Sequence, residues 1–328
     1  MVSWRAVASN HDLARMRAFV AAVLMDRPMA EAPPRELLPV GHLAPIAYRR
    51  GMQSAKADYA ACMVVAARRR RVLEEVIRAL TAREIDIALI KGCAFVGTIY
   101  PDPAERPMND MDVLIRRPQL PDAVQLVQEL GFQRVGFDRK MSDFYHATVF
   151  LRGDVMLELH RNIVQPYRTA IPIDDVWART TLDPVGVGER RLDRIDELLI
   201  CAVHVARHEL IVPAINYVDV ARLWNRLTEE QRATMWSRAK AWRVARAVAA
   251  VFAMKDNLAT GSPDAPNIGL GSRILPTTTD VLLGTQPKRA RQIAQKLLLA
   301  QGTRDRLGLG FVTVAAIVDG WWRARSTA

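Results

Sequence analysis

Cysteine is scarce in this sequence, and its few cysteines form no recognisable pattern. Only three of the 328 residues are cysteines, and no two of them stand in a CxxC spacing. They are Cys62, Cys93 and Cys201. Three isolated cysteines exclude a disulfide framework and a zinc knuckle, both of which need closely paired cysteines. A reducing compartment, the cytoplasm, fits this usage best.

The chain also lacks a long hydrophobic run. Residues 1–24 carry charges within their apolar stretch, which is not typical of a secretory signal. A helix that spans a bilayer needs roughly 20 apolar residues. The nearest candidate, Leu307 to Trp322, is shorter and contains Asp319. We therefore expect no membrane span, and we expect this last segment to be a docked helix.

Acidic residues are outnumbered, 35 against 46 basic ones, which gives a formal charge of +11. With 50% hydrophobic and 25% charged residues, the chain has the composition of a folded globular protein and not of a disordered one. The excess positive charge suits an anionic partner such as a nucleotide or a nucleic acid. It fits an ordinary basic surface equally well, so charge alone selects no partner.

Apolar spacing divides the chain into three parts. Residues 1–84 are expected to form an N-terminal helical region, with a long amphipathic helix at 54–84. Residues 85–185 contain short apolar runs between glycine and proline turns, which predicts a small mixed sheet. Residues 186–328 begin with a linker at 186–193 and predict no strand. The fold class is therefore α+β, with a sheet core flanked by helices and an α-helical C-terminal region.

Individual elements can be assigned inside these parts. The expected strands are 85–90, 111–115, 146–152 and 155–161. The expected C-terminal helices are 194–209, 214–227, 229–257 with one break, and 288–301. In the core, helices are expected at 93–100 and 121–130, the second ending at Gly131 because glycine accepts the left-handed conformation after a helix end. Gly153 and Asp154 predict a hairpin turn.

Two carboxylates begin the second expected strand. A proline-rich loop leads into Asp110-Met111-Asp112, and residues two apart on a strand point to the same face. Carboxylates held side by side repel each other and raise each other's pKa unless a cation lies between them. Neutralising Asp112 is then expected to leave the metal-free stability unchanged or slightly higher. Mg²⁺ prefers oxygen ligands and fits this pair, with Mn²⁺ as a substitute.

A third carboxylate lies in the last expected strand. Alternation along VMLELH places Glu158 and His160 on the face opposite to the neighbouring leucines. If this strand lies beside the strand of Asp110 and Asp112, three carboxylates converge on one site, as they do where two metal ions promote phosphoryl transfer. An acidic pair alone often occurs by chance, so its sequence context has to decide.

That context resembles the uncharacterised nucleotidyltransferases of the DNA polymerase β-like superfamily. The resemblance covers about residues 85–223 and lies in IALIKGCAFVGTIYPDPAERPMNDMDVLI, VMLELHRN and LLICAVHVARHE, in this order. It implies transfer of a nucleoside monophosphate from a nucleoside triphosphate to an acceptor, with release of pyrophosphate. It also implies that Asp110, Asp112 and Glu158 hold two Mg²⁺ ions.

The resemblance extends to a nucleotide site next to the carboxylates. Gly92 would be the glycine that lets the backbone approach the nucleotide, and Cys93 stands where many members have a serine or glycine that contacts a phosphate. Lys91 is expected to reach a phosphate instead of serving as a solvated lysine at a strand end. Arg106 either pairs with a phosphate or braces the acidic pair. His160 either contacts the acceptor or is an ordinary hydrogen-bonded strand histidine.

Two histidines on an expected helix share a face, because His204 and His208 are four residues apart. Some zinc sites use this spacing, but the glutamate of an HExxH motif is absent. We expect these histidines to pack against the catalytic core. A zinc site is not expected.

Two functions from different classes fit the sequence. The first is a metal-dependent nucleotidyltransferase, and the second is a non-catalytic nucleotide- or RNA-binding module that retains the fold. Three clustered carboxylates favour the enzyme, because a pure binder of anions has little use for them. The acceptor stays open between RNA such as tRNA, a protein side chain and a small molecule.

Overall fold

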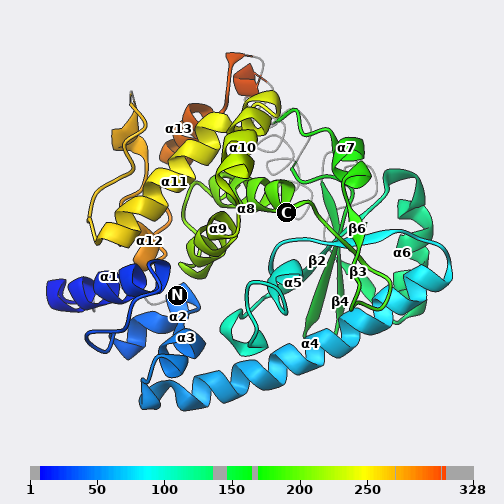
Figure 1. The fold of residues 1–328 in the computed structure, drawn as a ribbon, viewed down its shortest axis with the longest axis horizontal. Helices are drawn as coiled ribbons and strands as arrows, with labels where there is room; N and C mark the ends of the chain where they lie inside the picture. The colour runs from blue at the N-terminus through cyan, green and yellow to red at the C-terminus, as the bar shows by residue number, and fades with distance from the viewer. Residues whose placement is uncertain (1–7, 136–145, 165–168, 270, 304, 308–328) are drawn as a thin grey trace, which may run out of the picture.

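The computed structural model describes residues 8–135, 146–164, 169–269, 271–303 and 305–307 (Figure 1). A sheet lies at one side of the molecule and a group of helices at the other, and one long helix runs beneath both (Figure 1). No helix within these ranges combines the length and the apolar character needed to cross a bilayer. The expected docked helix at 307–322 falls almost wholly outside the described residues.

The sheet has seven strands in the order β3-β4-β5-β2-β1-β7-β6. They are β1 (Ile87–Leu89), β2 (Asp110–Ile115), β3 (Gln133–Val135), β4 (Ala147–Arg152), β5 (Val155–His160), β6 (Thr181–Leu182) and β7 (Arg190–Arg191). The central strand β2 pairs with β5 in parallel and with β1 in antiparallel orientation. The mixed α+β class is therefore confirmed.

All four strands expected from the sequence are present, but the sheet is larger than expected. The prediction that residues 186–328 contain no strand is wrong, because β7 pairs with β1, and β6 extends the sheet beyond β7. The pair Arg190-Arg191 forms a strand through tertiary pairing, in which Arg190 lies opposite Ala88. Two-residue strands built from arginine have no apolar alternation that a sequence pattern could detect. The expected linker at 186–193 thus contains a sheet strand.

Helices account for most of the remaining structure. They are α1 (Asn10–Leu24), α2 (Leu38–Gly41), α3 (Ala44–Arg49), α4 (Lys56–Ala82), α5 (Gly92–Phe95), α6 (Leu120–Glu129), α7 (Ile173–Ala178), α8 (Arg194–Arg207), α9 (Ile215–Asn225), α10 (Glu229–Ala241), α11 (Ala245–Thr260), α12 (Thr278–Leu282) and α13 (Arg289–Leu299). The expected break within 229–257 is confirmed at Arg243, whose φ is 57°. Gly131 has the left-handed φ of 84° expected after α6.

The helix expected at 93–100 is much shorter than predicted. Helix α5 ends at Phe95, and the chain then turns through Gly97, whose φ is 78°. A short bridge pairs Val96 with Tyr100 directly after it. Glycine adopts this φ without the steric cost that other residues meet, which explains why the apolar spacing did not continue as a helix.

Helix α4 connects the two parts of the molecule. It runs along the bottom of Figure 1 from the N-terminal helices to the sheet. Its buried side chains are confined to the last third, at Val76, Ile77 and Leu80, where it covers the sheet. At the opposite end of the molecule, α1 contacts α9, α11 and α12, so the first and last helices of the chain share one helical part.

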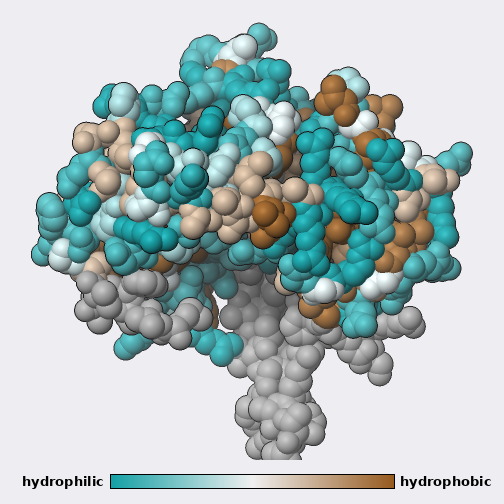
Figure 2. Space-filling model, turned by 90° about the horizontal axis from the view of Figure 1, so that it is seen from below, coloured by the Kyte–Doolittle hydropathy of each residue, from teal (hydrophilic) through white to brown (hydrophobic). Residues whose placement is uncertain are grey.

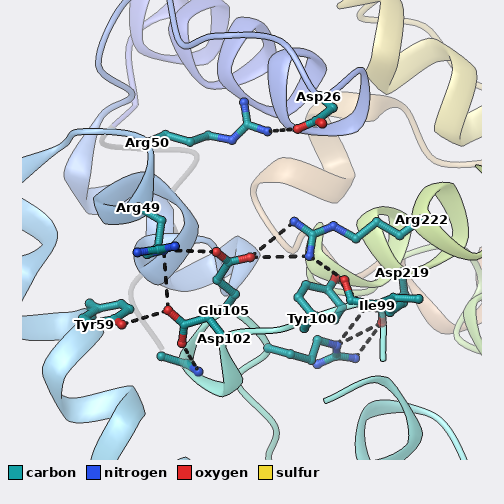
Figure 3. Close-up of polar contacts among 12 residues, drawn as sticks. Asp26, Arg49, Arg50, Tyr59, Ile99, Tyr100, Asp102, Glu105, Asp219 and Arg222 are labelled. Carbon is teal, nitrogen blue, oxygen red and sulfur yellow. Dashed lines mark hydrogen bonds and ion pairs between the residues drawn. The ribbon is translucent and has the colours of Figure 1, made fainter. Parts of the chain in front are cut away.

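A buried ion pair joins the helical part to the loop that precedes β2. The Arg106 guanidinium donates to both carboxylate oxygens of Asp219 on α9, at 2.8 to 3.0 Å. The Tyr100 hydroxyl donates to the same carboxylate at 2.7 Å (Figure 3). Asp219 and Tyr100 are fully buried, so these charge-assisted hydrogen bonds are shielded from water. The loop is therefore held at a defined place relative to α9.

A second, more exposed set of contacts lies around this pair (Figure 3). Arg222 of α9 donates to the Ile99 carbonyl at 3.0 Å and to Glu105 at 3.4 Å. Arg49 of α3 lies 3.5 Å from the carboxylates of Asp102 and Glu105. The irregular loop thus contacts α3 and α9 at once, and its position does not depend on regular secondary structure.

We predict that Asp219→Asn destabilises the protein strongly. It leaves the buried Arg106 without its counter-charge, which should lower the free energy of unfolding by about 3–5 kcal/mol. Asp154→Ala is the control. Asp154 pairs with Arg68 at the surface, where the Arg68 side chain is 58% exposed and the Asp154 side chain is 61% exposed. This pair should contribute about 1 kcal/mol at most to the free energy of unfolding. Urea unfolding followed by circular dichroism measures both. Equal effects of the two substitutions would contradict the anchoring role.

Candidate active site

The parallel pairing of β2 with β5 brings the expected carboxylates together. Asp112 lies opposite Glu158 in the register of the two strands, and Asp110 lies opposite Met156. Because alternate residues of a strand share a face, Asp110, Asp112 and Glu158 all lie on one side of the sheet. The predicted adjacency of these strands, on which the third carboxylate depended, is confirmed.

His160 links two of the three carboxylates. Its Nε2 lies 2.7 Å from Oδ1 of Asp112 and 3.1 Å from Oε2 of Glu158, and its side chain is fully buried. One ligand atom from each of these residues lies within 4.8 Å of the others. In the structure His160 is thus hydrogen-bonded to the carboxylates themselves, and its contact with an acceptor stays a prediction.

Lys91 places a positive charge beside the same carboxylates. Its Nζ lies 2.6 Å from Oδ1 of Asp112, and both side chains are almost fully buried. The residue sits between β1 and α5 with φ 53° and ψ −137°, a conformation that is costly for a residue with a side chain. This strained residue is the one whose side chain pairs with Asp112. A phosphate contact, the role expected from the sequence, stays a prediction.

Gly92 follows at a point where no side chain fits. A Cβ at this residue would lie 2.8 Å from both Cγ and Sδ of Met108. Any larger residue would therefore have to displace the Met108 side chain. Gly92 lines the same cavity as the acidic pair, and its approach to a nucleotide stays a prediction.

The two aspartates of this cluster have pKa values shifted in opposite directions. Burial disfavours the charged form of Asp112, but Lys91 and the hydrogen bond with His160 outweigh it and hold the pKa of Asp112 well below its usual range. Burial and the negative charges of Asp112 and Glu158 raise the pKa of Asp110 to about 6. From the sequence alone, we expect that removing the charge of Asp112 relieves the repulsion between the aspartates. The contacts in the structure show that removing the charge of Asp110 relieves it instead.

The acidic pair opens into a cavity of about 250 Å³ between the sheet and the helical part. The wall from the core includes Lys91, Gly92, Asp110 and Asp112. The facing wall comes from the helical part and includes His42, His204, His208 and Asn216. The cavity is thus completed by residues that are distant in sequence. His204, His208 and Asn216 follow the aspartates by more than 90 positions, and His42 precedes them.

Sequence reasoning found the core wall of this cavity and missed most of the facing wall. His204 and His208 were expected to pack against the core, and the structure shows that both line the cavity. Burial lowers the pKa of His204 well below its ordinary value, and its Nδ1 has no hydrogen-bond partner within the described chain. His42 and Asn216 were not predicted as site residues, because both lie far from the carboxylates in sequence.

The remaining two expected nucleotide contacts are Arg106 and Cys93. Arg106 lines the same cavity, but its guanidinium is engaged by Asp219, so the alternative in which it braces the acidic pair is not what the structure shows. Burial raises the pKa of the Cys93 thiol to about 12, and Cys93 lines a different cavity under α4. Phosphate contacts of Arg106 and Cys93 stay predictions.

The donor set of this cluster suits a hard divalent cation. Asp112 and Glu158 offer oxygens within 4.8 Å of each other, and the adjacent Asp110 carries a negative charge that costs free energy in the absence of a cation. Mg²⁺ binds through one or two carboxylates together with substrate phosphates. Asp112 and Glu158 therefore fit such an ion, whereas a ligand role for Asp110 stays a prediction.

Comparison with known proteins identifies the family of this chain. A family model described as "Uncharacterised nucleotidyltransferase" matches residues 14–259, and this chain therefore belongs to that family of nucleotidyltransferases. None of the curated proteins matches significantly. Among solved structures, the antibiotic-resistance factor ANT(2'')-Ia is similar at 13% identity and a TM-score of 0.34, over 58% of this chain and 96% of that one.

We predict that Asp110→Asn stabilises the metal-free protein at pH 7. The folded-state pKa of about 6 lies above the ordinary value of 3.8, so ionised Asp110 costs stability as the pH rises through this window. Removing the charge should raise the free energy of unfolding by about 1–3 kcal/mol. Urea unfolding in EDTA at pH 7 measures the gain, which should shrink as the pH falls toward about 4.

Asp112→Asn is the matched comparison and should have the opposite sign. It removes the partner of the buried Lys91 and His160, so the metal-free protein should lose stability. If Asp112→Asn raises the free energy of unfolding, or if Asp110→Asn lowers it, the contacts described above do not determine which aspartate bears the cost of the repulsion.

Proposed function

We propose that this chain transfers a nucleoside monophosphate from a nucleoside triphosphate to an acceptor hydroxyl in a metal-dependent reaction. The observation that supports this most directly is the register of β2 and β5, which places Asp112 opposite Glu158 beside Asp110. In the reaction the acceptor oxygen bonds to the α-phosphorus, the bond from that phosphorus to the bridging oxygen breaks, and pyrophosphate leaves. The acceptor hydroxyl loses its proton in this exchange.

Asp110, Asp112 and Glu158 would hold two Mg²⁺ ions, with Mn²⁺ as a substitute. Bound there, the ions would activate the acceptor oxygen and neutralise charge on the triphosphate and the leaving pyrophosphate. The protein's own contribution is positioning and electrostatics, since phosphoryl transfer asks for little covalent chemistry from side chains. The raised pKa of Asp110 supports this assignment, because a cation removes the cost of its charge.

Two neighbouring residues would serve the triphosphate. Lys91 carries a buried positive charge at the edge of the cavity, where it can attract a phosphate as well as Asp112. Gly92 lets the backbone approach the nucleotide without a Cβ in the way. The facing wall of His42, His204 and Asn216 would then enclose the nucleotide from the helical side and limit access of water.

The second candidate function is a non-catalytic nucleotide- or RNA-binding module. The net charge of +11 is compatible with it, and binding to RNA would weaken steeply with salt. The strained backbone of Lys91 and the raised pKa of Asp110 favour the enzyme, because a module that only binds anions gains nothing from a concentrated negative cluster. The acceptor can be RNA such as tRNA, a protein side chain or a small molecule in the cytoplasm.

The test of the proposed function is transfer of a labelled α-phosphate. The protein is incubated with each α-labelled nucleoside triphosphate and Mg²⁺ against separate pools of cellular RNA, protein and metabolites. We expect one pool to become labelled with release of pyrophosphate, and no labelling with Asp112→Asn or in EDTA. Nucleotide binding without labelling of any pool would support the binding module instead.

Glu158 gives a sharper prediction, because it faces Asp112 across the two strands. Glu158→Gln keeps the size of the side chain and removes its charge. Nucleotide binding should survive, since the aspartates and the phosphates hold the nucleotide-bound ion, while transfer should fall by about 10²–10⁴-fold. Calorimetry of nucleotide binding and single-turnover transfer on the same preparation check both. Transfer at the parent rate would exclude Glu158 as a ligand.

A further inference from the structure

A second cavity lies on the other face of the catalytic strand. It has a volume of about 280 Å³ and is enclosed by α4, by the sheet and by the loop between β6 and β7. Met111 lines it, whereas Asp110 and Asp112 line the acidic cavity. Because neighbouring residues on a strand point to opposite faces, β2 separates the two cavities. The second cavity is therefore distinct from the acidic cavity, although Cys93, an expected phosphate contact, lines it.

The interior of this cavity is aliphatic. Its inner lining includes Leu73 and Ile77 of α4, Leu89 of β1, and the sulfur-containing side chains of Met108 and Met111. None of the described residues that line it is aromatic. Small-molecule sites are typically apolar with a few polar groups and measure roughly 300–1,000 Å³, so this cavity lies near the lower end. Without a ring for stacking, it suits an alkyl chain better than a nucleobase.

The rim of the cavity carries a surplus of positive charge. Four arginines and three carboxylates line it, and two of these arginines are already paired: Arg70 with Glu74 at 2.9 Å and Arg191 with Asp183 at 2.6 Å. The third carboxylate, Glu189, accepts a backbone hydrogen bond from Val187. The remaining arginines are Arg69 and Arg78.

These two arginines are available to a ligand. Arg69 donates only one long hydrogen bond, 3.4 Å to the Asn109 carbonyl. Arg78 is exposed and has no ion pair or hydrogen bond to any residue that the structure describes. Both belong to the face of α4 that covers the cavity, where lining residues recur three and four positions apart. With four arginines and three carboxylates, the lining has one positive charge in excess, and one anionic head group would neutralise it.

Exposed apolar side chains gather on the segments that flank this cavity. Six large hydrophobic side chains are exposed in the described part of the chain, and four of them lie here. Val64 and Val65 directly precede the lining residue Ala66 on α4, and Leu182 and Val185 lie at the β6–β7 loop. Figure 2 views the molecule from the side along which α4 runs and shows apolar patches within a mainly hydrophilic surface. Such patches commonly mark binding sites.

We propose that this cavity binds an amphipathic organic anion, with an alkyl chain in the aliphatic interior and a carboxylate or phosphate head at Arg78. The site also touches the reaction centre indirectly. Met108 lines both cavities and fills the space over Gly92. A ligand that packs on Met108 would therefore fix the loop that leads into the acidic pair.

The test compares ligands that share a ten-carbon chain and differ in head group. Decanoate, decyl phosphate and decyltrimethylammonium are titrated by calorimetry into the full-length protein without metal or nucleotide, so the result does not depend on the proposed function. We expect saturable one-to-one binding of at least one anion and at least tenfold weaker binding of the cation. Whichever anion binds more tightly identifies the head group, and both results support the site.

Variants locate the binding. Arg78→Glu should weaken the anion at least tenfold, whereas Arg71→Glu, the same charge change on the same helix outside the lining, should leave the affinity within about threefold. Leu73→Trp should fill the interior and abolish binding, with thermal melts showing that both proteins remain folded. The proposal is overturned if neither anion binds saturably, if the cation binds equally well, or if Arg78→Glu and Leu73→Trp bind like the parent. If adenosine monophosphate binds instead of the anions, and Leu73→Trp weakens that binding, the assignment of an alkyl chain to the interior is wrong.

Discussion

Three carboxylates share one face of β2 and β5, and the surrounding structure is arranged around the cost of holding them together. Asp112 is compensated by Lys91 at 2.6 Å and by His160 at 2.7 Å. Asp110 lies two residues before Asp112 on the same face. Its negative charge is compensated less, and its pKa is raised to about 6. The negative charge that remains therefore faces the cavity. There it can be neutralised by a cation.

This arrangement requires that an irregular loop arrive at β2 in a fixed position. Residues 101–109 contain three prolines and cannot be held by a strand ladder or a long helix. The buried pair of Arg106 and Asp219 holds them, together with the Tyr100 hydroxyl. The helical part of the chain therefore borders this cavity: α9 anchors the loop, and α8 with its C-cap residue provides His204 and His208.

The two faces of β2 have different chemistry. One face presents carboxylates to a polar cavity, and the other presents Met111 to an aliphatic cavity with an arginine rim. Met108 belongs to the lining of both, and its packing over Gly92 leaves no room for a side chain there. A molecule bound on one face can thus affect the other through a single residue, without a change in the sheet.

The sequence by itself determined the local features of this protein. Alternation along β2 and β5 fixed which carboxylates share a face, and apolar spacing with glycine positions fixed most helices, because these patterns repeat over a few residues. Only the tertiary structure decided which groups compensate these charges. Lys91, His160 and Asp112 meet because β2 lies between β1 and β5. The partner of Arg106 is Asp219, 113 residues away, and a contact over that distance follows from packing and leaves no local pattern.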